Sequence, residues 1–130
     1  MTVPEAVETL IADAAVSAHL ATSVDDRPHV APVWFAYHDG VVSVLTGGRK
    51  LANVRENPRV ALSIERADGP DADWSVTIRG TARVVEDPER FRSAVRRVFR
   101  KYQGPDTDVP DDPGGALVEI EVGSATASRY

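Results

Sequence analysis

The sequence predicts a mainly β fold: a small antiparallel barrel of six strands with helices packed on its outside. Two observations predict it. The six strand-like segments are short and are mostly joined by hairpin turns within only 130 residues. They also follow the order helix, three strands, short helix, two strands, long helix and strand, which lacks the regular βαβ alternation of a parallel sheet. We expect residues 1–130 to form a single domain.

The first part of the chain predicts one helix and one strand. Apolar residues recur with helical spacing over residues 3–14, and Thr2 and Glu5 have the spacing of a capping box. A short strand is expected over residues 17–22. The acidic, proline-containing segment 25–28 then predicts a turn.

A β-hairpin is predicted next. Residues 29–37 are apolar on both faces of an extended strand, so we expect both faces to be covered. Pro32 lies inside this strand and cannot donate a ladder hydrogen bond, which indicates an edge strand or a bulge. The His-Asp-Gly run at 38–40 is typical of a tight turn into the β-branched strand 41–46.

The middle of the chain predicts a short helix and two further strands. The helix follows residue 50 and ends before Pro58. Residues 60–65 alternate between apolar and polar or small side chains, as in a strand with one buried face. Residues 67–73 are expected to be a polar loop, and residues 74–84 a long, half-buried antiparallel strand.

The last part predicts the long helix and the final strand. Asp87 followed by Pro88 is typical of a helix start. An apolar helical stripe follows, made by Phe91, Ala94, Val95, Val98 and Tyr102. The opposite face is basic and is interpreted as a solvated surface, with the steering of an anionic ligand as the alternative. It contains Arg92, Arg96, Arg97, Arg100 and Lys101. An acidic loop at 104–115 leads to a strand at 116–122.

Composition limits the function classes. The chain has no cysteine, so disulfides, thiolate metal sites and a cysteine nucleophile are excluded. A net charge of −5 argues against a general nucleic-acid binder, which needs a basic face. We expect no membrane partner, because no stretch approaches the roughly 20 apolar residues of a membrane span. With no signal peptide visible, a cytoplasmic location is expected.

The segment Thr46-Gly47-Gly48-Arg49-Lys50 predicts a phosphate clamp, a name that we use for these five residues throughout. It lies where a strand ends and a helix begins, and a helix N-terminus favours anions. The two glycines allow the backbone to approach a ligand closely. Arginine offers a planar fork for phosphate oxygens, and lysine a point charge. The alternative is a solvated connection with two surface cations.

Hydrolytic and metal chemistry have no support in the sequence. There is no Walker motif, no G-x-G-x-x-G run and no nucleophile elbow. His19, His29 and His38 show no metal-ligand spacing. A phosphate site without hydrolytic machinery indicates that the phosphate is a handle and that the bound molecule does the chemistry, as in phosphorylated redox cofactors.

Several short motifs occur in a specific order: L-A-T from Leu20, R-P-H-V-x-P-V-W-F from Arg27, T-G-x-R-K from Thr46, N-P-R-V from Asn57 and G-T-A from Gly80. Together they resemble the pyridoxamine 5′-phosphate oxidase-like superfamily over residues 16–122. The resemblance implies an FMN-binding split β-barrel with flanking helices. It also implies a homodimer that holds FMN or the deazaflavin coenzyme F-420 at the subunit interface.

The resemblance also assigns roles to residues. Arg49 and Lys50 match the phosphate-binding pair, Thr46 a strand-end hydroxyl, and Trp74 a position that reaches the partner's cofactor. The strand containing Val33 matches the one whose backbone lines the flavin ring. The predicted cofactor-binding residues are Pro32, Val33, Trp34, Thr46, Gly47, Gly48, Arg49, Lys50 and Trp74. No catalytic or metal-binding residue is predicted.

The sequence therefore predicts an oxidoreductase that depends on coenzyme F-420 or FMN and transfers hydride to or from a small organic substrate. The short deazaflavin-type branch of the family is the better match. Dimerisation is also expected from the strand at 29–37, whose two apolar faces exceed what one small subunit covers. Two alternatives are a non-catalytic FMN-binding or storage protein and a haem- or tetrapyrrole-binding split barrel, in which the three histidines are the candidate ligands.

Overall fold

The computed structural model describes residues 3–68 and 70–130. Three helices and seven strands follow one another in this part of the chain. They are α1 (Glu5–Ile11), β1 (Ala18–Val24), β2 (Arg27–Val33), β3 (Phe35–His38), β4 (Val41–Thr46), α2 (Gly48–Glu56), β5 (Arg59–Asp68), β6 (Asp71–Val85), α3 (Pro88–Gln103) and β7 (Ala116–Arg129). Thr2, half of the predicted capping box, lies outside the described residues.

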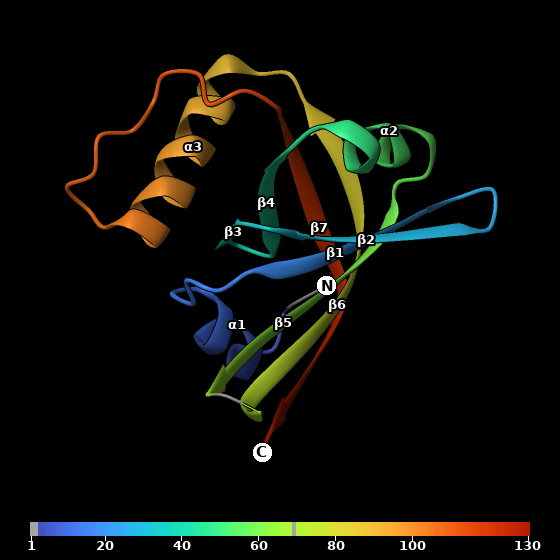
Figure 1. Ribbon diagram of the computed structural model, residues 1–130, viewed down its shortest axis with the longest axis vertical. Coiled ribbons are helices and arrows are strands. Elements are labelled where there is room, and N and C mark those ends of the chain that lie inside the picture. The colour runs from blue at the N-terminus through green and yellow to red at the C-terminus, as the bar shows by residue number, and fades with distance from the viewer. Residues whose placement is uncertain (1–2, 69) are drawn as a thin grey trace.

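The strands form one antiparallel sheet in the order β2-β1-β5-β6-β7-β4-β3. β2 and β3 lie at its two edges, although only Trp34 separates them in the chain. Because this short link joins the edges, the sheet has to curl until they meet, and β2 contacts β4 there. Figure 1 shows the curled sheet with the helices on its outside. The predicted mainly β split barrel is confirmed.

The strand count differs from the predicted six because the segment 29–37 is two strands. β2 pairs with β1, whereas β3 pairs with β4. Each half has an extended, alternating pattern, so the break at Trp34 is invisible to periodicity alone. The edge position expected for Pro32 is confirmed, since β2 is an edge strand. In the single chain the segment is not fully covered, because Val30 is 65% exposed.

Two other boundaries differ from the predictions. Most of the loop expected at 67–73 is strand, because β5 runs to Asp68 and β6 starts at Asp71, and residue 69 lies outside the described residues. The chain there is rich in Asp and Gly, which conceals the pairing of two strand ends across a bulge. β7 continues to Arg129, beyond the predicted end at residue 122, because the long β6 supplies pairing partners as far as Trp74.

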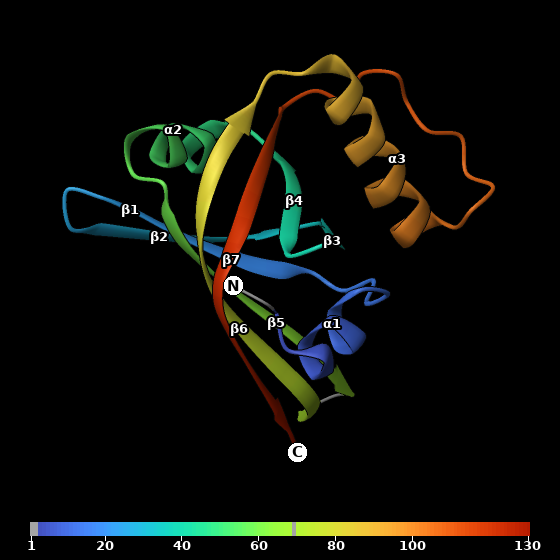
Figure 2. The ribbon, with the colours of Figure 1, turned by 180° about the vertical axis from the view of Figure 1, so that it is seen from behind.

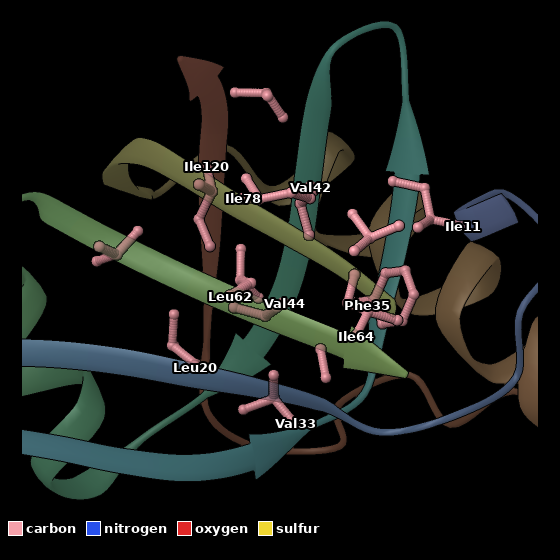
Figure 3. Close-up of a cluster of buried hydrophobic side chains, with 14 of the residues drawn as sticks. Ile11, Leu20, Val33, Phe35, Val42, Val44, Leu62, Ile64, Ile78 and Ile120 are labelled. Carbon is pink, nitrogen blue, oxygen red and sulfur yellow. The ribbon is translucent and has the colours of Figure 1, made fainter. Parts of the chain in front are cut away.

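The core lies inside the curled sheet. The strands contribute inward side chains, β2 through Val33, and α1 closes one end with Ile11, which is completely buried. Figure 3 shows these side chains converging from the strands. The residues labelled there are Ile11, Leu20, Val33, Phe35, Val42, Val44, Leu62, Ile64, Ile78 and Ile120. Burial of each large side chain contributes about 1.5–3 kcal/mol.

The helices occupy two ends of the barrel. α2 contacts β1 and β6, and α3 packs on β3, β4 and β7. In both Figure 1 and Figure 2, α2 and α3 lie toward one end of the molecule and α1 toward the other. The predicted start of α3 is confirmed, since the Asp87 carboxylate accepts hydrogen bonds from the backbone N–H groups of Glu89 and Arg90.

Candidate functional site

The phosphate clamp connects β4 to α2. Thr46 is the last residue of β4, Gly47 caps α2, and Gly48 begins the helix. Gly48 has φ +60, a left-handed conformation that favours glycine at this position. No side chain among the described residues caps α2, so its first N–H groups and its positive dipole end are available to an anion. Arg49 is exposed and Lys50 half-buried beside them.

Thr46 places an unpaired polar atom at the clamp. Its side chain is buried, yet its Oγ1 has no hydrogen-bond partner within residues 3–68 and 70–130. A buried hydroxyl that is left unpaired costs about 1–3 kcal/mol. A ligand oxygen or an ordered water would complete the bonding of such a group. The clamp thus combines helix N–H groups, two cations and a hydroxyl that needs a partner.

The residues 32–34 reach the same end of β4. β3 pairs Phe35 with Val44, two residues before Thr46, and this pairing ends at Phe35. Val33 is buried and also pairs with Ala18 of β1, so it lies at the barrel closure. Pro32 is exposed on β2. Because β2 contacts β4 at the closure, the segment 32–34 lies near the end of β4, where the clamp begins.

The last turn of α3 contacts Trp34, the break between β2 and β3. The Trp34 indole stacks on the Tyr102 ring, with centroids 4.5 Å apart and planes 3° from parallel. The Phe99 ring meets the indole in a T-shaped contact at 6.0 Å. The Tyr102 hydroxyl accepts the Phe35 N–H at 3.2 Å and donates to the Val16 carbonyl at 2.6 Å. Sequence reasoning places Tyr102 in the apolar stripe of the long helix and does not predict these contacts.

Lys101 corrects the prediction of a wholly solvated basic face. Arg92, Arg96, Arg97 and Arg100 are exposed, but the Lys101 amine is buried and has no hydrogen-bond partner among the described residues. It lies 3.4 Å from the Phe35 ring centroid, a cation–π contact. Burial lowers the pKa of Lys101 to about 8, and the Asp13 carboxylate opposes part of that shift.

A polar cavity of about 410 Å³ lies between α2 and the β1–β2 hairpin. Arg49 of the clamp, His29 and Asn53 are among its lining residues. The His29 Nδ1 is buried without a hydrogen-bond partner in the described part of the chain. Asn53 is buried and donates to the Thr22 Oγ1 at 3.0 Å. Sequence reasoning identifies His29 only as a candidate metal or haem ligand. Its place in the R-P-H-V motif is the sequence signal that could have assigned it to this cavity.

Trp74 lies away from the clamp within one chain. It is 6% exposed in the core, near the start of β6, and faces Arg66 and Arg129 across the sheet. The clamp lies near the opposite end of β6, because Val85 pairs with Leu117, whose neighbour Ala116 pairs with Thr46. Residues 74 and 85 are roughly 36 Å apart along a strand. A role for Trp74 in reaching a partner's cofactor stays a prediction.

Residues 3–68 and 70–130 hold no group of three or more His, Cys, Asp or Glu side chains that is suited to a metal ion. Within these ranges, every helix is too short or too polar to cross a bilayer.

A protein-family model described as pyridoxamine 5′-phosphate oxidase matches residues 4–129. The chain belongs to this family. The match covers the clamp, the closing strands and all three helices. A comparison with curated proteins finds no match.

Solved structures support the same fold. A conserved hypothetical protein from Mycobacterium tuberculosis is 26% identical, with a TM-score of 0.80 over 99% of this chain and 86% of that one. An F-420 reductase is 27% identical, with a TM-score of 0.72 over 95% and 98%. A FAD-binding protein from Mesorhizobium loti is 21% identical, with a TM-score of 0.73 over 98% and 95%. The structural relatives thus include flavin-type and deazaflavin-type proteins.

Replacing Lys101 with Met should raise the melting temperature at pH 7. The folded pKa of about 8 lies below the ordinary value of 10.5, so the protonated amine destabilises the native state at neutral pH. The unfolding free energy of the wild type should increase as pH rises from about 8 to 10.5, because the unfolded chain binds more protons there. The difference in melting temperature between variant and wild type should shrink over that range. Thermal unfolding of both proteins from pH 7 to 10.5 measures this.

The control for this measurement is Arg100→Met, which removes an exposed cation that stays charged throughout. Its effect on the melting temperature should not change with pH. A Lys101→Met protein that is less stable than wild type at pH 7 would show that the cation–π contact outweighs desolvation.

Proposed function

We propose that the protein is an oxidoreductase that binds coenzyme F-420 or FMN by its phosphate and transfers hydride to or from a small organic substrate. The observation that carries this proposal is the clamp itself: within residues 3–68 and 70–130, the buried Thr46 hydroxyl has no hydrogen-bond partner, and two cations follow it at a helix N-terminus that no side chain caps. The family match and the likeness to an F-420 reductase over nearly the whole chain support a cofactor of this type. The same likeness makes the deazaflavin the preferred candidate.

The residues of the clamp fit a phosphate. Arg49 would form paired hydrogen bonds to two phosphate oxygens, Lys50 would add a charge, and the Thr46 hydroxyl would donate to a third oxygen. The backbone N–H groups at the start of α2 would face the same anion. The bound coenzyme would supply the hydride chemistry, and the segment 32–34 would fix the orientation of its ring.

We also propose that the working form is a homodimer. Val30 is 65% exposed on the outer face of β2, flanked by the exposed Pro28 and Pro32. The neighbouring outer surface of the sheet holds a shallow trough of about 730 Å³, lined mainly by small side chains such as Ala21 and Ala61. A second copy would cover this apolar edge and the trough beside it, which Arg59 and Arg79 also line.

Turnover tests the proposed activity. Reduced coenzyme is mixed anaerobically with a panel of unsaturated or oxidised acceptors, and the visible absorbance of the coenzyme is followed. Catalytic recovery of the oxidised spectrum supports an oxidoreductase. Tight binding without turnover across the panel would instead identify a flavin-binding or storage protein. No binding of either coenzyme would remove the proposal.

Replacing both clamp cations, Arg49→Ala with Lys50→Ala, should weaken binding of FMN or coenzyme F-420 at least 100-fold. Each charge-assisted hydrogen bond contributes about 1.5–3 kcal/mol, and about 1.4 kcal/mol corresponds to a factor of ten. Titration calorimetry measures the dissociation constants. The matched control, Arg55→Ala with Arg92→Ala, removes two exposed cations elsewhere and should bind normally. Equal affinities for the two double variants would contradict the clamp.

Thr46→Val should have opposite effects on stability and on binding. Valine keeps the shape and removes an unpaired buried hydroxyl, so the free protein should gain about 1 kcal/mol of unfolding free energy. Coenzyme affinity should fall about 5- to 10-fold, because the phosphate loses a donor. Thr22→Val is the control: it deprives Asn53 of its hydrogen-bond acceptor and should lose stability. A less stable Thr46→Val protein with normal affinity would count against the site.

Val30→Glu should convert the dimer to a monomer, because a carboxylate cannot be buried cheaply in an apolar interface. Sedimentation velocity at matched concentrations measures the assembly state. Thr9→Glu adds the same carboxylate at an exposed position of α1 and should remain dimeric. A wild-type protein that sediments as a monomer would rule out the shared site.

A further inference from the structure

We propose that Tyr102 is a positioning residue that fixes the Trp34 indole as the stacking platform for the planar ring of the bound ligand. This inference rests on the proposed function, because the ligand is the phosphorylated ring compound held by the clamp. It goes beyond that function in assigning α3, an element outside the barrel, a part in ring recognition. Trp34 would contact the ligand, and Tyr102 would act through Trp34.

The hydroxyl of Tyr102 supplies bonds that the broken strand cannot supply. β2 ends at Val33 and β3 begins at Phe35, so the backbone leaves one ladder as it crosses the break. The Phe35 N–H donates to the Tyr102 Oη at 3.2 Å. The same hydroxyl donates to the Val16 carbonyl at 2.6 Å, just before β1. One side chain therefore ties the break to the segment that leads into β1, the strand that pairs with β2.

The ring of Tyr102 fixes the indole at the same time. The two rings are parallel within 3° and 4.5 Å apart, so Tyr102 covers one face of Trp34. Phe99 restricts the indole from a second direction. Trp34 nevertheless stays 41% exposed, so aromatic surface remains available for stacking. An aromatic side chain held by two neighbours loses little further freedom when a ligand ring stacks on it.

The location of this platform suits a ligand that is anchored at the clamp. β3 pairs Phe35, the residue after Trp34, with Val44, two residues before Thr46. Neighbouring strand residues are roughly 3.3 Å apart. A molecule whose phosphate occupies the clamp would therefore have its ring within reach of the indole. Lys101, the residue before Tyr102, packs on the ring of Phe35. Two consecutive residues of α3 therefore contact Trp34 and the first residue of β3.

Tyr102→Phe tests the inference, because it keeps the stacked ring and removes both hydrogen bonds. We expect FMN affinity to fall about 5- to 20-fold. We also expect the fluorescence emission of Trp34 to change. For this measurement Trp74 is replaced by Phe in all proteins, so that the emission comes from Trp34. The inhibition constant of inorganic phosphate against FMN should stay unchanged, because the clamp is intact. Tyr37→Phe is the matched control: its hydroxyl also donates to one acceptor, Glu8, and accepts one N–H, that of Gly40. It should lose stability while retaining FMN affinity.

A double-mutant cycle with Trp34→Ala separates positioning from a general loss of structure. If Tyr102 acts through Trp34, the losses of FMN affinity should not add in the double variant. Additive losses, or a parallel loss of phosphate binding, would overturn the inference. So would wild-type FMN affinity and unchanged emission in Tyr102→Phe. If the wild-type protein binds neither coenzyme, the proposed function is contradicted. The Trp34 emission then still tests the positioning role, and unchanged emission in Tyr102→Phe would contradict that role too.

Discussion

The structure depends on one covalent constraint, the single residue that joins the two edges of the sheet. β2 and β3 are consecutive in the chain but lie at opposite edges, so the sheet can satisfy both pairings only by curling into a barrel. Trp34 lies in neither strand, so the backbone ladder is interrupted at this residue. The hydroxyl and ring of Tyr102 stabilise the backbone and the side chain there.

The same closure explains where a ligand site is found. β4 is brought against the end of β2, and its last residue, Thr46, opens directly into α2. A strand end, a helix N-terminus and a glycine pair meet at one end of the barrel, where the N–H groups at the start of α2 and the Thr46 hydroxyl lack side-chain partners within residues 3–68 and 70–130. Charge complementarity with a phosphate would satisfy them together. The barrel thus supplies a rigid support, and the junctions between its elements supply the chemistry.

Local patterns in the sequence are sufficient for most of the fold. The cap at Asp87 and the turn at residues 39–40 are encoded within a few residues, and the structure confirms both. The break at Trp34 is not predictable in this way, because it is imposed by pairing with distant strands. The clamp is recognisable because its parts are adjacent in the chain. Tyr102 is not, since its bonds to Phe35 and Val16 span 67 and 86 residues.

The central claim is that a phosphate is the handle by which this protein holds a redox ring. The most direct test compares FMN with riboflavin, which has the same ring and ribityl chain but no phosphate. Titration of the wild-type protein should show FMN binding at least 100-fold more tightly, with the difference shrinking as salt is added. Equal affinities for the two compounds would contradict the account.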